Sequence, residues 1–253
     1  MNRKYTIFGI LIVAILVITG IWLWNWVLGD TQAASGPISA IPVMTETTPI
    51  GVVPTEIQIK ATDEPIVEET LVESVPLVFQ INQQESQTSF MIFEELRGQP
   101  KDVIGTTNQI AGEIVLNPND LSTTRAGVIQ INARTLVTDD DRRNQAIRNR
   151  ILNTDAYEFI TFTPTQISGL EGTATEGQEF TFQVTGDLTI RDITKPVVFD
   201  VTAQLVTEDQ LIGHAVAKIQ RSDFNIVIPS VPFVANVGEE IALEINLVAN
   251  PSP

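Results

Sequence analysis

Apolar and polar residues alternate almost without interruption between residues 180 and 205. Apolar side chains take every second position up to Ile190 and again from Val197 onward, with polar residues between them. A period of two places alternate side chains on opposite faces of a β-strand. The two runs, joined by a short connection around Asp192, therefore predict an antiparallel hairpin with one buried and one wet face.

Seven further stretches show the same strand-like alternation or apolar character. They cover residues 77–82, 88–93, 109–116, 126–133, 158–167, 210–220 and 240–249. One stretch, 139–152, has helical spacing instead, with Asp139 to Asp141 at its expected N-terminus and arginines after them. About eight or nine short strands without alternating helices predict an all-β antiparallel barrel or sandwich with one helix.

The first 28 residues have a different pattern. Residues 5–28 contain no Asp, Glu, Lys, Arg or His. Arg3 and Lys4 precede this stretch, and three tryptophans lie near its end. Roughly 24 residues at about 1.5 Å each would span about 36 Å, enough to cross a bilayer core. We predict a single-pass signal anchor in the cell membrane, with the N-terminus cytoplasmic and the rest extracytoplasmic; a cleaved signal peptide is the alternative.

Residues 29–74 are rich in Pro, Thr and acids and poor in aromatics. This composition predicts a disordered, extended linker between the anchor and a folded domain at residues 75–250. Residues 1–28 hold two cations and no acid, so the remainder carries a formal charge of −18, against −16 for the whole chain. Such acidity disfavours nucleic acid as a partner.

The sequence offers little catalytic or metal-binding chemistry. There is no cysteine, and His214, the only histidine, is expected to be exposed because it lies opposite the apolar series of its strand. The run Asp139 to Asp141 lacks the spacing of a calcium loop and fits helix capping better. We therefore expect no cofactor, no metal and no enzymatic activity.

The interior of the predicted domain combines bulky and small residues. Glycines 112, 127, 186 and 213 and alanines 215 and 217 fall among the inward positions. Small inward residues either permit tight bends or leave space unfilled, so a packed interior and a ligand cavity both remain open. The residues predicted to line a cavity are Phe90, Ile92, Ile114, Ile131, Phe162, Phe182, Leu188, Phe199, Val201, Leu243 and Ile245.

Six motifs in order resemble the YceI-like family of bacterial polyisoprenoid-binding proteins, over roughly residues 75–250. They are Ser86-x-Thr88-x-Phe90-x-Ile92, Gly105-Thr106-Thr107 through Ile114, Arg142-Arg143 through Leu152, Ile160 to Pro164, Gly186 to Val197, and Arg221-Ser222-Asp223-Phe224. The resemblance implies an eight-stranded lipocalin-like barrel with one outer helix that holds a long isoprenoid or other lipid chain without catalysis.

The chain departs from the family pattern at three positions. Glu94 lies near a position where members often have His, and Asp192 and Asn225 stand where they often have Gly. If that His touches a ligand head group, the acidic pair Glu94–Glu95 would change the preferred head group.

These observations favour a membrane-anchored exported protein that holds an isoprenoid or fatty-acyl amphiphile for transport, storage or sequestration. Arg142 and Arg221 are the candidates to meet a phosphate or carboxylate head group, although structural pairing with acids is the plainer interpretation. A stress-protection or protein-interaction domain with a filled barrel is the alternative, and an enzyme acting on a lipid is the third reading. The sequence leaves open whether the protein forms a homodimer.

Overall fold

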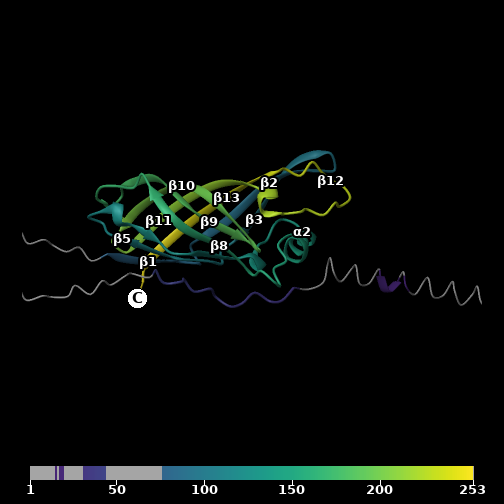
Figure 1. The fold of residues 1–253 in the computed structure, drawn as a ribbon, viewed down its shortest axis with the longest axis horizontal. Coiled ribbons are helices and arrows are strands. Elements are labelled where there is room, and N and C mark those ends of the chain that lie inside the picture. The colour runs from purple at the N-terminus through teal and green to yellow at the C-terminus, as the bar shows by residue number, and fades with distance from the viewer. Residues whose placement is uncertain (1–14, 16, 20–30, 44–75, 253) are drawn as a thin grey trace, which may run out of the picture.

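The protein folds into an all-β antiparallel sheet that curls around an apolar interior (Figure 1). The computed structural model describes residues 15, 17–19, 31–43 and 76–252. Most of the predicted anchor at 5–28 and most of the predicted linker at 29–74 lie outside these residues. Among the described residues, no helix combines the length and the apolar character needed to span a bilayer.

Within the residues that the structure describes, thirteen strands make up the sheet, more than the eight predicted. The predicted strands at 109–116 and 126–133 are interrupted, and strands also form at 99–107 and 234–235, where the sequence predicts connections. The thirteen strands are β1 (Leu77–Ile81), β2 (Gln87–Leu96), β3 (Gln99–Thr107), β4 (Ile110–Ala111), β5 (Glu113–Leu116), β6 (Arg125–Ala126), β7 (Ile129–Asn132), β8 (Phe159–Ser168), β9 (Glu179–Ile190), β10 (Ile193–Thr207), β11 (Gln210–Gln220), β12 (Val234–Ala235) and β13 (Glu240–Pro251). The prediction of an all-β antiparallel fold is confirmed.

The sheet order brings the two ends of the sheet close together. Neighbouring strands follow the order β4-β7-β8-β9-β10-β11-β13-β1-β5-β6, and β13 also pairs with β2, which pairs with β3 and β12. Strands β4 and β5 are separated in the chain only by Gly112, whose carbonyl accepts a hydrogen bond from the Ile81 N–H at 3.0 Å. Strand β4 begins this order and β5 lies near its other end, yet the two strands are consecutive in the chain. The two edges of the sheet therefore come together at residues 110–116, and the sheet curls around the side chains between them.

The hairpin predicted from alternation is the best paired part of the sheet. Twelve residue pairs join β9 and β10, including Phe182 with Val201 and Val184 with Phe199. Its turn consists of Arg191 and Asp192, and Arg191 has a left-handed backbone with φ of 57°. The side chain of Arg191 donates hydrogen bonds to the carbonyls of Ile151 and Asn225. This turn is thereby held against the helical segments.

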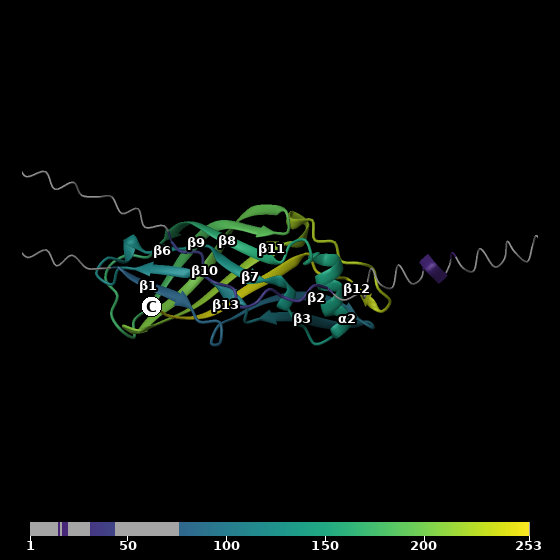
Figure 2. The same cartoon turned by 90° about the horizontal axis from the view of Figure 1, so that it is seen from below.

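The helical segments gather at one end of the curled sheet, called here the helix end (Figure 2). They are α2 (Asp141–Ala146), the π-helix η3 (Ile147–Ile151) that continues it, and the 3-10 helix η4 (Arg221–Phe224); two more 3-10 helices, η1 (Leu121–Thr123) and η2 (Ala133–Thr135), lie elsewhere in the chain. The Asp140 carboxylate accepts a hydrogen bond from the Arg143 N–H at 2.9 Å, so it caps α2 as the acidic run predicts.

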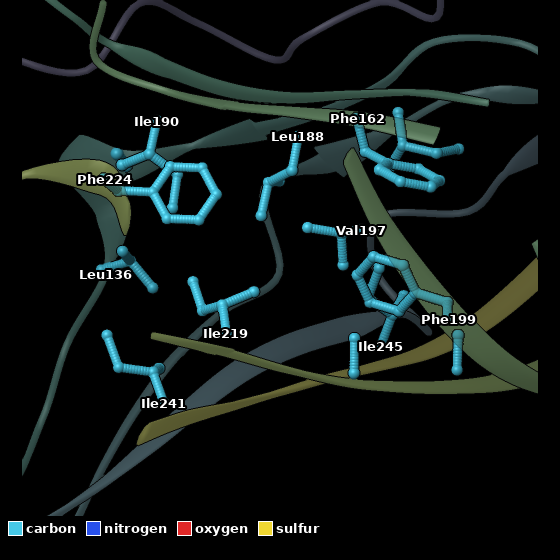
Figure 3. Packing of buried hydrophobic residues seen from close by; sticks show 14 of the residues in the cluster. Leu136, Phe162, Leu188, Ile190, Val197, Phe199, Ile219, Phe224, Ile241 and Ile245 are labelled. Carbon is cyan, nitrogen blue, oxygen red and sulfur yellow. The ribbon is translucent and has the colours of Figure 1, made fainter. Parts of the chain in front are cut away.

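A packed core fills the helix end of the interior (Figure 3). Phe224 is 1 % exposed and Leu188 is 3 % exposed, and they pack with Leu136, Ile190, Ile219 and Ile241. These side chains come from strands on different sides of the curled sheet and from η4. This half of the interior therefore has the packed arrangement that the sequence left open as one alternative.

Residues 31–43, called here the strap, lie along the outside of the sheet (Figures 1 and 2). Near the helix end the Ser35 N–H donates to Glu158 at 2.7 Å, and further along the Val43 N–H donates to Glu113 at 2.9 Å. Ile38, between them, is buried. Composition predicts a disordered, extended linker here, and the structure instead attaches residues 31–43 to the folded domain, because buried or paired carboxylates accept hydrogen bonds from their backbone.

Glu158 is the most connected of these anchors. Its carboxylate forms an ion pair with Arg134 at 3.0 Å and accepts a hydrogen bond from Asn132 at 2.8 Å. Burial by itself would raise the pKa of Glu158, but the hydrogen bonds from Ser35 and Asn132 and the charge of Arg134 together lower it. The strap is therefore held by an ionised carboxylate.

We predict that Glu158→Gln lowers the free energy of unfolding by about 2–4 kcal/mol, because Arg134 is left buried without its counter-charge. Amide exchange at Ser35 should accelerate more than exchange at Val43, which Glu113 holds. Because the folded pKa of Glu158 lies below its unfolded value, its contribution is present above that unfolded value and is lost as pH falls through the folded pKa. Asp187→Asn, at an exposed position, is the control, and equal effects of the two substitutions would contradict this role for Glu158.

Candidate ligand-binding cavity

The end of the interior opposite the helices is hollow. A cavity of about 130 Å³ lies there, lined mainly by residues of β8, β9, β10, β11 and β13, with others from β1, β5, β6, β7 and from the connections β5–β6 and β8–β9. Its walls are almost entirely apolar, and Phe180, Phe182, Leu205 and Leu211 are among them. An apolar cavity of about this size remains dry and accepts small apolar molecules.

Two phenylalanines form the boundary between the packed half and the cavity. The rings of Phe162 and Phe199 meet edge to face with centroids 4.9 Å apart, and both residues belong to the core and to the cavity wall. Gly186 makes room for this arrangement, since a Cβ at that position would lie 2.5 Å from Cζ of Phe162. The glycine thus lets an aromatic ring lie directly on the neighbouring strand.

Three loops, called here the cap, close the other side of the cavity: residues 117–124, 169–178 and 208–209. Leu121, Leu170 and Ala174 point into the cavity wall from the first two. The loops bond to one another, since the Leu121 N–H donates to the Gly172 carbonyl at 2.8 Å and the Ala174 N–H donates to the Pro118 carbonyl at 2.6 Å. The cavity therefore lies between a floor of aromatic rings and a cap of loops.

Polar groups are scarce in the cavity wall. Thr124 and Gln204 are the polar lining residues among those that the structure describes. The Gln204 amide donates to the Gly177 carbonyl at 2.6 Å and so supports the cap. The Thr124 hydroxyl oxygen is buried and has no hydrogen-bond partner within the described ranges. Thr124 is thus the side chain that a polar atom of a ligand could satisfy.

The residues predicted to line a cavity divide into two groups. Ile114, Phe162, Phe182, Phe199, Val201 and Ile245 lie in the wall. Phe90, Ile92, Ile131, Leu188 and Leu243 do not, and belong to or pack against the core toward the helix end. Alternation identifies the inward face of each strand correctly for these residues, but it does not say at which height along the strand the interior is empty.

Several wall residues were not predicted. Leu121 lies in η1, and Leu170 and Ala174 lie in a loop, so none of them belongs to an alternating strand pattern. The available signal was an isolated apolar residue among Gly, Asn, Thr and acidic neighbours, as at Leu170. An isolated apolar residue of this kind can face the interior even when its neighbours indicate a turn.

The inward glycines only partly leave space. Gly213 and Ala215 do line the cavity. Side chains already cover Gly112 and Gly186, however, because a Cβ on Gly112 would lie 2.4 Å from Cδ1 of Ile129 and a Cβ on Gly186 would lie 2.5 Å from Cζ of Phe162. Gly127 allows the strap to approach, with Cγ2 of Val43 2.9 Å from the position of an added Cβ.

The two head-group candidates lie away from the cavity. Arg221 follows β11 at the helix end, where it donates to the carbonyls of Gly238 and Ile226 and forms an ion pair with Glu239 at 3.1 Å. Arg142 is exposed on α2, at the same end. Neither guanidinium is placed to meet a polar group that emerges through the cap.

The acidic pair Glu94–Glu95 is also remote from the cavity. Glu94 is buried and forms an ion pair with Arg143 of α2 at 2.8 Å, while Glu95 accepts a hydrogen bond from Asn236. His214 is exposed, as predicted, and lies 2.9 Å from Glu244. Among the described residues, no group of three or more His, Cys, Asp or Glu side chains could hold a metal ion.

A curled antiparallel sheet with an apolar cavity inside is the architecture of proteins that enclose hydrophobic ligands. The model of the YceI-like domain matches residues 79–249, and the chain belongs to this family. The family assignment predicted from the six motifs is thereby confirmed. Within the family such domains act as binding domains.

Two solved structures show the same fold. BcnA of Burkholderia cenocepacia is 20% identical, with a TM-score of 0.52 over 67% of this chain and 99% of that one. A domain from Saccharophagus degradans, described as a polyisoprenoid-binding domain implicated in plant cell wall breakdown, is 12% identical, with a TM-score of 0.55 over 70% and 99% of the two chains. No curated protein matches the chain.

We predict that Gly186→Ala lowers the free energy of unfolding by about 1–3 kcal/mol, because the new methyl group would displace the Phe162 ring or the β8 backbone. Urea denaturation would measure the change. Gly36→Ala is the matched control, since nothing lies within 4 Å of its added Cβ. A Gly186→Ala protein as stable as the control would show that the ring is not confined by this glycine.

Proposed function

We propose that this protein binds the apolar chain of an amphiphile, an isoprenoid or fatty-acyl chain, in the cavity beneath the cap, without chemical conversion of the ligand. The observation that carries the proposal is an interior cavity whose wall is apolar apart from Thr124 and Gln204. Membership of a family of binding domains and the polyisoprenoid-binding description of the Saccharophagus degradans domain support it.

The strand pairing supports the eight-stranded lipocalin-like barrel that we include in the proposal. Strands β1 and β2 follow one another along β13, and β3, β4 and β5 form one interrupted stretch. In this proposal, each interrupted stretch acts as one strand of a closed barrel, of the kind that holds one slender ligand. We include in the proposal the membrane anchor at residues 5–28, which would keep the barrel outside the cytoplasm.

The size of the cavity limits how much of a ligand it holds as it stands. A volume of about 130 Å³ is close to that of an apolar cavity that accepts one benzene molecule. A longer chain must therefore displace the cap or extend between its loops. Transport, storage or sequestration would each depend on that opening.

Binding should follow chain length until the cavity is full. In a series of straight-chain primary alcohols, we expect Kd to fall about fourfold per methylene, or about 0.8 kcal/mol, and then to fall less steeply once the chain passes the cap. Displacement of the fluorescent apolar dye N-phenyl-1-naphthylamine would measure it. A Kd independent of chain length would contradict burial of the chain.

Filling the cavity from one wall should abolish this binding. Ala215→Leu adds three carbons at an inward position of β11 that lines the cavity. We expect Kd for 1-octanol to rise at least tenfold, with no loss of folding. Ala242→Leu is the matched control, because Ala242 pairs with the exposed Met91 and with Lys218 rather than with cavity residues. Unchanged binding by Ala215→Leu, or no binding of any alcohol by the unaltered protein, would favour the filled-barrel alternative.

A further inference from the structure

The cap carries charge of one sign only. Its three loops contain five carboxylates and no Lys, Arg or His. The carboxylates are Asp120, Glu171, Glu176, Glu208 and Asp209, and all five residues are exposed. No cation of the cap itself is available to neutralise them.

These carboxylates belong to the connections that supply or adjoin residues of the cavity wall. Leu121 and Leu170, in the wall, are the chain neighbours of Asp120 and Glu171. On the other side, Leu205 and Leu211 of the wall bracket the turn that holds Glu208 and Asp209. The Glu208 N–H donates to the Glu176 carboxylate at 3.1 Å, which joins this turn to the second loop. A ligand that leaves the cavity through the cap must pass between these groups.

The cations of the folded domain lie mainly at the other end. Four arginines are in α2 and η3, Arg191 forms the β9–β10 turn, and Arg221 begins η4. Arg125, beside the first cap loop, is the exception. Acids accompany these cations at the helix end, for example Glu94 beside Arg143 and Glu239 beside Arg221. The cap loops, by contrast, carry five acids and no cation, so a ligand that emerges through them meets uncompensated negative charge.

The cavity wall also has one unsatisfied polar atom. The Thr124 hydroxyl is buried, lies at the base of the first cap loop and has no partner among the described residues. A hydroxyl can donate to, or accept from, an uncharged alcohol, carbonyl or amine group. It would not offset the full charge of a carboxylate or phosphate in an apolar wall.

We propose that the cavity selects amphiphiles whose polar end is uncharged and hydrogen-bonds to Thr124, or is cationic and stays among the cap carboxylates, and that these carboxylates exclude amphiphiles with an anionic end. This inference rests on the proposed function, since it concerns the ligand of the same cavity. It also reverses the expectation, drawn from Arg142 and Arg221, of a phosphate or carboxylate head group.

Three ligands with one chain test the selection: 1-octanol, octylammonium and octanoate at pH 8, each measured by displacement of N-phenyl-1-naphthylamine. At low salt we expect octanoate to bind about tenfold more weakly than the other two, from unscreened repulsion by several carboxylates. The difference should shrink at about 0.5 M salt, where the Debye length is only about 4 Å.

Charge-neutral variants locate the effect. The triple substitution Glu176→Gln, Glu208→Gln and Asp209→Asn should bring octanoate to within about threefold of 1-octanol. The matched control neutralises three exposed acids toward the helix end, Asp102→Asn, Asp192→Asn and Asp223→Asn, and should leave the tenfold difference intact. Equal changes in both triple variants would show that net charge, rather than the cap, sets the preference.

Thr124→Val removes the hydroxyl at nearly constant volume. We expect Kd for 1-octanol to rise about fivefold, the effect of one hydrogen bond, while Kd for octane stays unchanged. Equal affinity of the unaltered protein for octanoate and 1-octanol at low salt would overturn the inference and leave the proposed function standing. If none of the three ligands displaces the dye, the proposed function itself fails, and this inference with it.

Discussion

The contact between Phe162 and Phe199 is the constraint on which the organisation of the interior depends. The two rings come from β8 and β10 and meet across β9, and they can do so because Gly186 of β9 leaves the Phe162 ring room to lie on the strand. Toward the helices, side chains from many elements fill the space up to this pair. Toward the cap, the wall is built from strand ends and loops, and the space remains open. One glycine thus helps to divide a continuous sheet into a rigid half and a receptive half.

The two halves also differ in how their polar groups are satisfied. At the helix end, guanidinium groups such as those of Arg134 and Arg221 donate to several carbonyls and pair with acids, so these charges are part of the framework. In the cap, carboxylates face solvent, and the loops are joined by single hydrogen bonds such as those from Leu121 to Gly172 and from Ala174 to Pro118. Segments joined in this way open at lower cost than paired strands. The half closed by the cap, whose charged groups face solvent, is therefore also the half better suited to admit a ligand.

Much of the fold follows from the sequence, and less of the cavity does. A period of two places Phe182, Leu188 and Phe199 on inward faces, and the capping acids locate α2. The height of each residue along the barrel depends on registers between strands that are distant in sequence, which is why Leu188 and Leu243 lie outside the cavity wall although they face inward. The same limit applies to Gly112, because its free space is taken by Ile129 from another strand. The same holds for Arg142 and Arg221, because only the assembled sheet determines that they lie at the helix end and not beside the cavity.

The strap has a consequence for how the domain is presented to its surroundings. It begins beside Asp155 and Glu158 at the helix end and runs to Glu113. Whatever precedes residue 31 in the chain therefore joins the domain at the end opposite the cap. If the proposed anchor holds the N-terminal part at a membrane, the packed half would face that surface and the cap would face away from it.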